Sequence, residues 1–240
     1  MQTFSRIVRF LEATLFPPLC LLCRAHLLAE ERTRWLCGTC TIPFDFPIGF
    51  FCPFCKKRSP TIPSCHPETR FAGIAPWKYE NEKIRNLIHL LKYEGIKAAA
   101  IPLGEELRSY LLKSAALHGV PLSNFIIIPV PLHPRKLRKR GFNQSLLLAR
   151  SLRIPEMPLL EHALVRIRPT PPQTALGNRK ARTENIYGSF AISNEEAVRG
   201  KNILLLDDVI TSGATMREAA MALKKGGAKR IIGLAAARAF

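Results

Sequence analysis

The chain has 240 residues, with 36 Lys and Arg against 18 Asp and Glu, so its formal net charge is +18. Hydrophobic residues make up 47%, which is enough for a packed core and excludes a wholly disordered chain. No run approaches the roughly 20 apolar residues of a membrane span, so we expect no integral membrane segment. The positive charge favours anionic partners, namely phosphorylated metabolites, nucleic acid or an acidic membrane face. A solvated basic surface without such a role is the alternative.

Residues 1–17 are predicted to form a short amphipathic helix. Phe4, Ile7, Val8, Leu11 and Leu15 fall on one helical face. Charged residues interrupt the segment, whereas a signal peptide needs an uncharged apolar core and a cleavage site. We therefore predict a packing helix in a cytoplasmic protein, with a helix lying on a membrane surface as the alternative.

All seven cysteines lie between residues 20 and 65. Four of them form two pairs, Cys20-x2-Cys23 and Cys37-x2-Cys40, with thirteen residues between the pairs. Two such pairs are typical of a tetrahedral thiolate site for structural zinc, and in a cytoplasmic chain a metal is favoured over disulfides. The metal would supply folding free energy to a segment that is too small to fold on apolar burial alone.

A third pair, Cys52-x2-Cys55, is followed by Cys65 and forms only a partial second zinc site. A fourth ligand is expected near position 68, where Glu68 stands. His66 is a possible substitute, although its place next to Cys65 makes the geometry awkward. A crossed arrangement, in which the Cys52 pair contributes to the first site, stays open.

The residues after 70 alternate between strand-like and helix-like patterns, which is typical of a doubly wound α/β domain with a mostly parallel sheet and helices on both faces. We therefore divide the chain into residues 1–70, the N-terminal helix and a zinc-ribbon-like module, and residues 71–240, the α/β domain. Buried strands are expected at residues 71–79, 125–130, 203–206 and 230–236, and helices at residues 82–93, 98–118, 143–152 and 216–225.

A strongly basic segment follows the strand expected at 125–130. Five of the six residues from Arg135 to Arg140 are basic, and we expect them in a loop at the carboxyl edge of the sheet. A pyrophosphate group or a nucleic-acid backbone would be attracted there. A solvated, mobile loop is the alternative. The residues that we expect to receive an anion are Val130, Pro131, Leu132, His133 and Arg140.

Residues 203–215 combine a strand, two carboxylates and a loop of small residues. Asp207 and Asp208 directly follow four apolar residues, and the loop follows them. Such a loop at the start of a helix offers backbone N–H groups and the positive end of the helix dipole to a phosphate. The carboxylates can accept hydrogen bonds from sugar hydroxyls or help to organise a hydrated cation. The pattern predicts a ribose 5-phosphate site, with an ordinary strand–helix turn as the alternative. The predicted phosphate-binding residues are Thr211, Ser212, Gly213, Ala214 and Thr215.

The segment 166–190 carries Pro, Gly and scattered basic residues. A connection of this length in a compact domain is usually functional or disordered. We predict a lid that excludes water from the site, with Arg179 and Arg182 as candidate phosphate contacts. A plain connecting loop is the alternative.

Residues 203–215 resemble the phosphoribosyl pyrophosphate (PRPP) signature of type I phosphoribosyltransferases. Residues 128–145, together with residues 91–95 (LKYEG), are similar to the competence protein F (ComF) family of phosphoribosyltransferase-like proteins. The similarity runs from Cys20 to the last strand. The chain departs from the family pattern at Glu68, where a cysteine is common.

The resemblance implies that Asp207 and Asp208 hold the ribose 2- and 3-hydroxyls, and that residues 211–215 hold the 5-phosphate. It implies an enzyme that binds PRPP with Mg²⁺, transfers the phosphoribosyl group to an unidentified acceptor and releases pyrophosphate. No general base stands out in the sequence, and His133 is the one candidate. The resemblance also implies a link to DNA uptake in natural transformation. The alternative is a non-catalytic protein whose basic loop and zinc module bind single-stranded DNA, with DNA-uptake proteins as further partners.

Overall fold

The computed structural model describes residues 18–240 except for residues 62, 64, 67–70 and 169–187. The helix predicted at 1–17, Glu68 and the lid residues Arg179 and Arg182 lie outside the described residues. Contacts divide the chain into two compact units, Met1–Pro43 and Phe44–Phe240. The predicted boundary near residue 70 stays a prediction about which parts fold independently.

The described part of the first unit is a short, loop-rich module. An antiparallel bridge joins Leu19 to His26, and a single 3-10 turn, η1 (Gly38–Cys40), is the regular element of residues 18–43. The Cys20 amide donates to the carbonyl of Ala25 at 2.8 Å, so the chain turns tightly after the first cysteine. With so little regular structure, such a segment depends on added cross-links for its stability.

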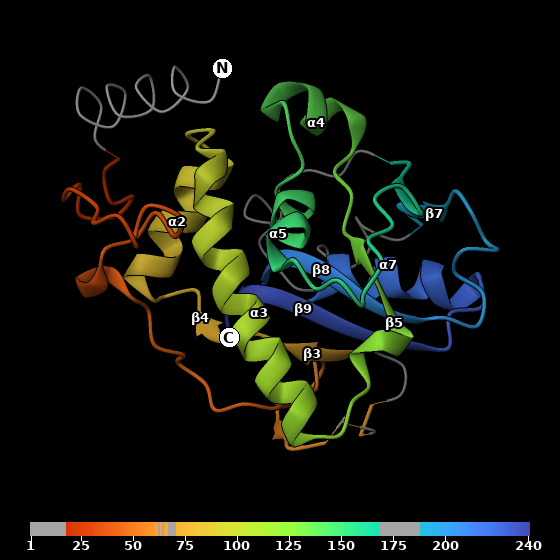
Figure 1. Ribbon diagram of the computed structural model, residues 1–240. Coiled ribbons are helices and arrows are strands. Elements are labelled where there is room, and N and C mark those ends of the chain that lie inside the picture. The colour runs from red at the N-terminus through yellow and green to blue at the C-terminus, as the bar shows by residue number, and fades with distance from the viewer. Residues whose placement is uncertain (1–17, 62, 64, 67–70, 169–187) are drawn as a thin grey trace, which may run out of the picture. The chain divides into compact units, whose positions relative to one another are not determined.

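The second unit is built on a mixed sheet with the strand order β2–β1–β3–β9–β8–β5, and β4 also pairs with β9 (Figure 1). The pairs β3–β9, β9–β8 and β8–β5 are parallel, whereas β1 is antiparallel to both β2 and β3. A separate antiparallel pair joins β6 to β7. The strands are β1 (Phe50–Phe51), β2 (Arg58–Ser59), β3 (Ala72–Ile74), β4 (Trp77–Lys78), β5 (Phe125–Pro129), β6 (Leu164–Arg166), β7 (Phe190–Ile192), β8 (Asn202–Ile210) and β9 (Arg230–Arg238).

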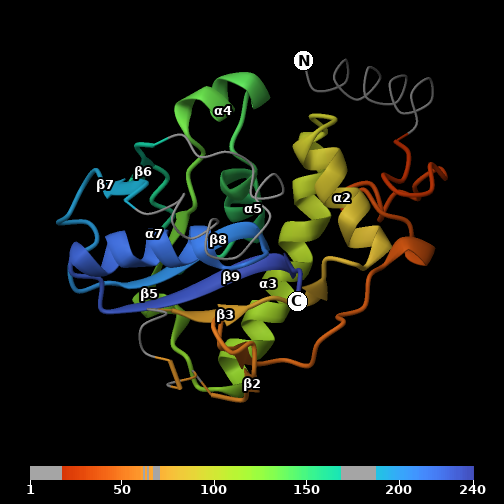
Figure 2. The ribbon, with the colours of Figure 1, turned by 180° about the vertical axis from the view of Figure 1, so that it is seen from behind.

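Helices cover both faces of this sheet. α3 crosses in front of β3 and β9 in Figure 1, and α7 lies in front of β8 and β9 in the reverse view of Figure 2. The predicted fold class, a mostly parallel sheet between helices, is confirmed. The helices are α2 (Glu82–Lys92), α3 (Ala100–Leu117), α4 (Pro134–Arg140), α5 (Gln144–Leu152) and α7 (Ala214–Lys225), with 3-10 turns η3 (Lys97–Ala99) and η4 (Leu122–Asn124). In the part of the chain that the structure describes, no helix has the length and apolar character needed to cross a membrane.

Two of the predicted strands differ from their expected extents by more than two residues. The strand predicted at 71–79 is divided into β3 and β4, because Pro76 between them has no N–H to donate to the ladder. β8 continues past its apolar residues to Ile210, so both carboxylates lie within the strand. Its pairing with β9 explains the extension, since Asp207 lies opposite Ala235 and Ile210 opposite Arg238.

The basic segment predicted as a loop is instead the helix α4, and this prediction was wrong. His133 caps the helix, because its ring Nδ1 accepts from the Arg135 amide at 3.2 Å, and Pro134 occupies the first turn. Gly141 ends the helix with φ +81°, a left-handed conformation that glycine adopts at little cost. Local capping therefore outweighs the mutual repulsion of the basic side chains.

Candidate functional site

Hydrogen bonds fix the two carboxylates near the carboxyl end of β8. Asp207 Oδ1 accepts from Ser145 Oγ and from the Asp208 amide, each at 2.9 Å, and Asp208 Oδ1 accepts from the Val209 amide at 2.8 Å. Both residues are less than a tenth exposed. Ser145 belongs to α5, so a helix packed on the sheet sets the orientation of Asp207.

Lys92, the last residue of α2, forms an ion pair with Asp208. Its Nζ lies 2.5 Å from Asp208 Oδ2, with 18% of the lysine side chain exposed. Burial lowers the pKa of Lys92, but the charge of Asp208 more than offsets this, so the pKa lies above its usual value. The pair places a permanent cation beside the two carboxylates.

Asp207 has an unusual protonation equilibrium. Burial raises its pKa from 3.8 to about 7, and the adjacent charge of Asp208 acts in the same direction. Lys92 and the hydrogen bond from Ser145 oppose the rise. A strongly shifted group in a pocket is a common mark of a functional site.

The loop of residues 211–215 connects β8 to α7. Gly213 is the N-cap of α7 with φ +74°, and no side chain caps the helix. The Ala214 amide donates to Ser212 Oγ at 3.4 Å. The first N–H groups of a helix have no partner within it, so this loop directs donors and the positive end of the helix dipole toward the sheet edge.

A second wall faces the carboxylates and is basic. We use the name "basic wall" for Lys136, Lys139 and Arg140 of α4 and Arg166 of β6. Arg140 donates to Gln144 Oε1 at 2.6 Å, which holds its guanidinium beside α5. Burial lowers the pKa of Lys136, and Arg166 and Arg140 lower it further. Bringing an anion between these cations would relieve their mutual repulsion.

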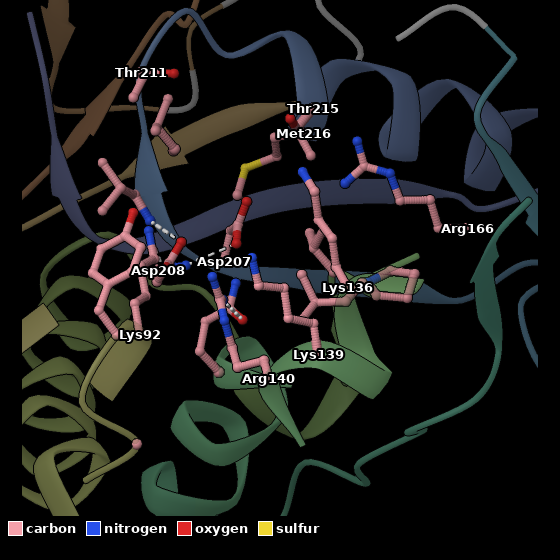
Figure 3. Close-up of a pocket in the computed structure, with 18 of the residues that line it drawn as sticks. Lys92, Lys136, Lys139, Arg140, Arg166, Asp207, Asp208, Thr211, Thr215 and Met216 are labelled. Carbon is pink, nitrogen blue, oxygen red and sulfur yellow. Dashed lines mark hydrogen bonds and ion pairs between the residues drawn. The ribbon is translucent and has the colours of Figure 1, made fainter. Parts of the chain in front are cut away.

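These elements enclose one pocket of about 660 Å³, shown in Figure 3. In the close-up, Thr211 and Thr215 lie on one side of the carboxylates and Lys136, Lys139 and Arg140 on the other. A volume of this size is typical of a site for a small metabolite. The predicted residues that line it are Asp207, Asp208, Thr211, Gly213, Thr215, Val130, Pro131, Leu132 and Arg140.

Not every predicted residue reaches the pocket. Among the described residues, Ser212 and Ala214 belong to the loop without lining the pocket, and His133 caps α4 instead. Sequence reasoning missed Lys92, Lys136, Lys139 and Arg166 as lining residues. The LKYEG segment at 91–95 was a usable signal for Lys92, whereas nothing in the sequence places Arg166 of β6 near β8.

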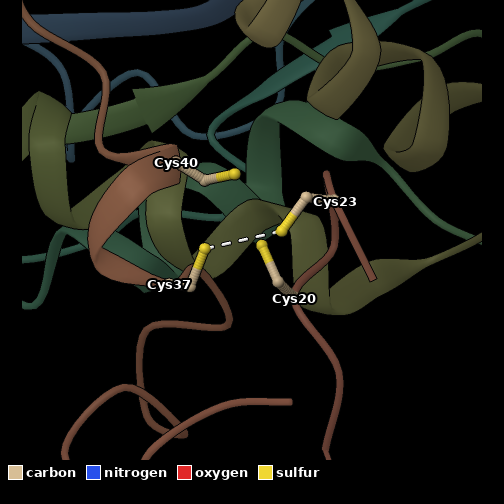
Figure 4. Close-up of side chains that lie close together, drawn as sticks. All are labelled: Cys20, Cys23, Cys37 and Cys40. Carbon is tan, nitrogen blue, oxygen red and sulfur yellow. Dashed lines mark hydrogen bonds between the residues drawn. The ribbon is translucent and has the colours of Figure 1, made fainter. Parts of the chain in front are cut away.

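The first four cysteines come together in the first unit (Figure 4). The sulfur atoms of Cys20, Cys23, Cys37 and Cys40 all lie within 4.8 Å of one another, and Cys23 Sγ is 3.5 Å from Cys37 Sγ. Tetrahedral thiolates around zinc lie about 3.8 Å apart, since each Zn–S bond is about 2.3 Å. The residues therefore fit a structural zinc ion, as predicted.

The second cluster lies in the second unit and has a complete set of donors. Cys52, Cys55, Cys65 and His66 offer ligand atoms within 4.8 Å of one another. Cys52 Sγ lies 3.5 Å from His66 Nδ1, and Cys55 Sγ lies 3.7 Å from Cys65 Sγ. His66 thus occupies the place for which a ligand near position 68 was expected. Three thiols and an imidazole also fit zinc.

The fold and the pocket define a domain of the phosphoribosyltransferase class. A family model described as "Phosphoribosyl transferase domain" matches residues 148–238, which include the second half of α5, β8, the 211–215 loop and β9. This match covers the carboxylates and the loop but not α4 or the cysteine clusters.

Relatives extend the match to most of the chain. The chain is 30% identical over 228 residues to the DNA utilization protein YhgH of Escherichia coli K12, covering 90% of this chain and 94% of the relative. It is 25% identical over 230 residues to the competence protein ComFC of Bacillus subtilis, covering 87% and 90%. It is 35% identical over 107 residues to competence protein F of Haemophilus influenzae, covering 44% and 46%. The chain belongs to the ComF family of phosphoribosyltransferase-like proteins.

Proposed function

We propose that the protein binds PRPP, or a closely related ribose 5-phosphate compound, in the pocket at the carboxyl edge of β8. The observation that carries the proposal is the meeting of three groups in one pocket: two fixed carboxylates, a helix-opening loop and a basic wall. Each suits one part of PRPP. The carboxylates accept hydrogen bonds from the ribose hydroxyls, the loop donates to the 5-phosphate, and the basic wall receives the pyrophosphate.

As an enzyme, the protein would transfer the phosphoribosyl group to an acceptor and release pyrophosphate. Bond breaking at the anomeric carbon leaves negative charge on the departing pyrophosphate, so Lys136, Arg140 and Arg166 would stabilise the transition state from fixed positions. Carboxylate oxygens are the ligands that Mg²⁺ prefers, so the pocket fits a hydrated Mg²⁺ that enters with the ligand and neutralises phosphate charge. The identity of the acceptor is not part of the proposal.

Calorimetric titration with PRPP and Mg²⁺ tests the proposal. We expect the wild type to bind, and the Asp207→Asn/Asp208→Asn variant to lose at least about 100-fold in affinity, because two charged acceptors become neutral amides. A Glu195→Gln/Glu196→Gln variant is the matched control, since it removes two carboxylates that are exposed outside the pocket. Equal affinity in the wild type and the aspartate variant would refute the site, and no binding by the wild type would refute the ligand.

A second function, binding of single-stranded DNA, is supported by a different surface. Arg135 and Arg138 of α4 are exposed and do not line the pocket, and 41% of Leu137 between them is exposed. The relatives from Bacillus subtilis and Haemophilus influenzae have the word "competence" in their names, and the relative from Escherichia coli has the words "DNA utilization". We expect an Arg135→Ala/Arg138→Ala variant to bind a single-stranded oligonucleotide more weakly and with a shallower salt dependence, while Asp207→Asn/Asp208→Asn leaves DNA binding unchanged. Loss of DNA binding in the aspartate variant would instead place the DNA in the pocket.

A further inference from the structure

Two ligands of the second cysteine cluster flank a turn that lies beside Gly213 of the 211–215 loop. These two ligands, Cys52 and Cys55, enclose a tight turn in which the Lys56 amide donates to the carbonyl of Cys52 at 2.8 Å and the Cys52 amide donates to the carbonyl of Lys57 at 2.9 Å. Pro53 in this turn is buried. We call residues 52–55 the knuckle turn.

Pro53 packs against Gly213, the residue on which the 211–215 loop bends. A Cβ placed on Gly213 would lie 3.8 Å from Pro53 Cβ and 3.9 Å from the Pro53 carbonyl oxygen. A Cβ at these distances would be in ordinary van der Waals contact, so Pro53 lies on the side of the loop toward which a side chain at position 213 would point. Gly213 also lines the pocket.

The next residue of the knuckle turn contacts the metal-binding cluster. The ring of Phe54 stacks on the imidazole of His66, with centroids 4.5 Å apart and an interplanar angle of 29°. Neighbouring residues of one turn therefore contact two different structures, the loop through Pro53 and a candidate metal ligand through Phe54. A change in the position of His66 would be transmitted over a single peptide unit.

The two ends of the knuckle turn are held by different means. At its start, Phe51 belongs to β1 and pairs with Gly73 of β3, and the Phe51 ring fills the space that a side chain at Gly73 would need. At its end, Cys55 Sγ lies 3.7 Å from Cys65 Sγ of the second cluster. Packing on the sheet fixes the first end, and bonds to a metal ion would fix the second.

We propose that a thiophilic divalent ion such as Zn²⁺, bound by Cys52, Cys55, Cys65 and His66, sets the geometry of the ligand-binding loop through Pro53. This inference rests on the proposed function of the 211–215 loop. Metal binding closes the knuckle turn, Pro53 is pressed against Gly213, and the donors of the loop are held ready for a phosphate. Pro53 is a positioning residue, and affinity for the phosphorylated ligand depends on the metal.

The test uses the full chain and ribose 5-phosphate without Mg²⁺, so that added metal does not complicate the result. Zinc content is measured by atomic emission, affinity by calorimetry, and mobility of the loop by hydrogen exchange of the peptide that contains residues 211–215. We expect Cys65→Ser to lose one zinc ion per chain relative to wild type, to bind ribose 5-phosphate about tenfold more weakly, and to exchange faster in the loop.

Two variants separate the metal from the contact that it supports. Pro53→Gly keeps all four ligands, so we expect wild-type zinc content together with the weaker binding and faster exchange of Cys65→Ser. Pro53→Ala keeps the Cβ that lies nearest Gly213, so we expect it to restore wild-type affinity. His66→Cys retains a four-ligand set and is expected to keep the wild-type zinc content.

The outcomes distinguish this inference from the proposed function. If Cys65→Ser loses zinc while affinity and loop exchange stay at wild-type values, the coupling is wrong and the pocket assignment stands. If the zinc-loaded wild type does not bind ribose 5-phosphate, the proposed function fails for this ligand, and loop exchange still decides whether the metal controls the loop. Unchanged exchange in Pro53→Gly would also overturn the coupling.

Discussion

The pocket has two walls that are built by different means. The β8 wall is a strand buried inside the sheet, and its carboxylates are held by hydrogen bonds from Ser145 and from the backbone. The second wall, which we call the α4 wall, is the part of the basic wall that belongs to α4. This seven-residue helix has no buried residue and is rich in Lys and Arg. The carboxylates of the β8 wall are buried and held in place by hydrogen bonds. The side chains of the α4 wall are partly or fully exposed and strongly charged.

This difference assigns different roles to the walls. Buried groups with fixed directions can distinguish the shape of a ligand and the positions of its hydroxyls, because a misplaced polar group there stays unsatisfied. Exposed cations attract any anion within about a Debye length and are screened by salt. We expect the β8 wall to determine which compound binds, and the α4 wall to determine how strongly additional phosphates are held.

Among single substitutions in the two walls, the largest effect is expected at the loop that continues the β8 wall. Gly213→Ala places a side chain at φ +74°, where a non-glycine residue costs roughly 1–2 kcal/mol, so the loop should leave its binding geometry. We expect affinity for ribose 5-phosphate to fall about tenfold or more in calorimetry. Gly227→Ala is the matched control, since Gly227 also has a positive φ (+87°) but follows α7 at its far end.

The comparison would fail if the two glycine variants behaved alike. Both should lower the free energy of unfolding, because both introduce a side chain into the left-handed region, and Gly227→Ala should lower it more, since its Cβ would lie 3.2 Å from Arg199 Cγ. Only Gly213→Ala should weaken ligand binding. Equal affinities for ribose 5-phosphate in the two variants would show that the loop geometry does not matter for the ligand.

A smaller effect, selective for one ligand, is expected at the α4 wall. Lys136→Met should weaken PRPP binding about fivefold at low salt, while the affinity for ribose 5-phosphate, which lacks the pyrophosphate, changes less than about twofold. Raising the salt to about 0.5 M should remove most of the difference. Arg135→Met is the control, because Arg135 is an exposed cation of the same helix that does not line the pocket. Equal losses for both ligands would contradict the division of roles.

The β8 wall could be predicted because its information is local. Apolar residues, two carboxylates and a small-residue loop are consecutive in the chain, and the strand, the turn and the helix appear in that order. The first cysteine cluster could also be predicted, since the spacing of the two pairs at 20–40 is typical of a tetrahedral zinc site. The pattern alone predicts a ribose 5-phosphate site, and the resemblance to type I phosphoribosyltransferases predicts PRPP as its ligand.

The remaining parts depend on tertiary structure. Arg166 reaches the pocket from β6, outside the main sheet, and no periodicity relates it to Asp207. The run of basic residues at 135–140 predicts a solvated loop, because like charges repel one another. The helix α4 forms instead because His133 and Gly141 cap its two ends. The sequence does not predict whether Cys65 and His66 can bind the same ion, because the directions of two adjacent side chains depend on the fold of the chain around them.

The smallest effect separates the walls by the pH dependence of stability. Asp207 has a pKa of about 7 in the folded protein against 3.8 when exposed, so the folded state binds this proton more tightly than the unfolded state. Stability contributed by Asp207 is therefore lost as the pH rises from about 4 to about 7.

Urea unfolding at pH 5 and pH 8 should show a smaller decrease in the free energy of unfolding for Asp207→Asn than for wild type, by about 1 kcal/mol. Lys139→Met, an exposed residue of the α4 wall, should keep the wild-type decrease. Lys92→Met should carry the decrease to higher pH, because Lys92 holds the pKa of Asp207 down. If Asp207→Asn and wild type lost stability equally between these pH values, the carboxylate would be as well solvated as the α4 wall, and the contrast between the two walls would be wrong.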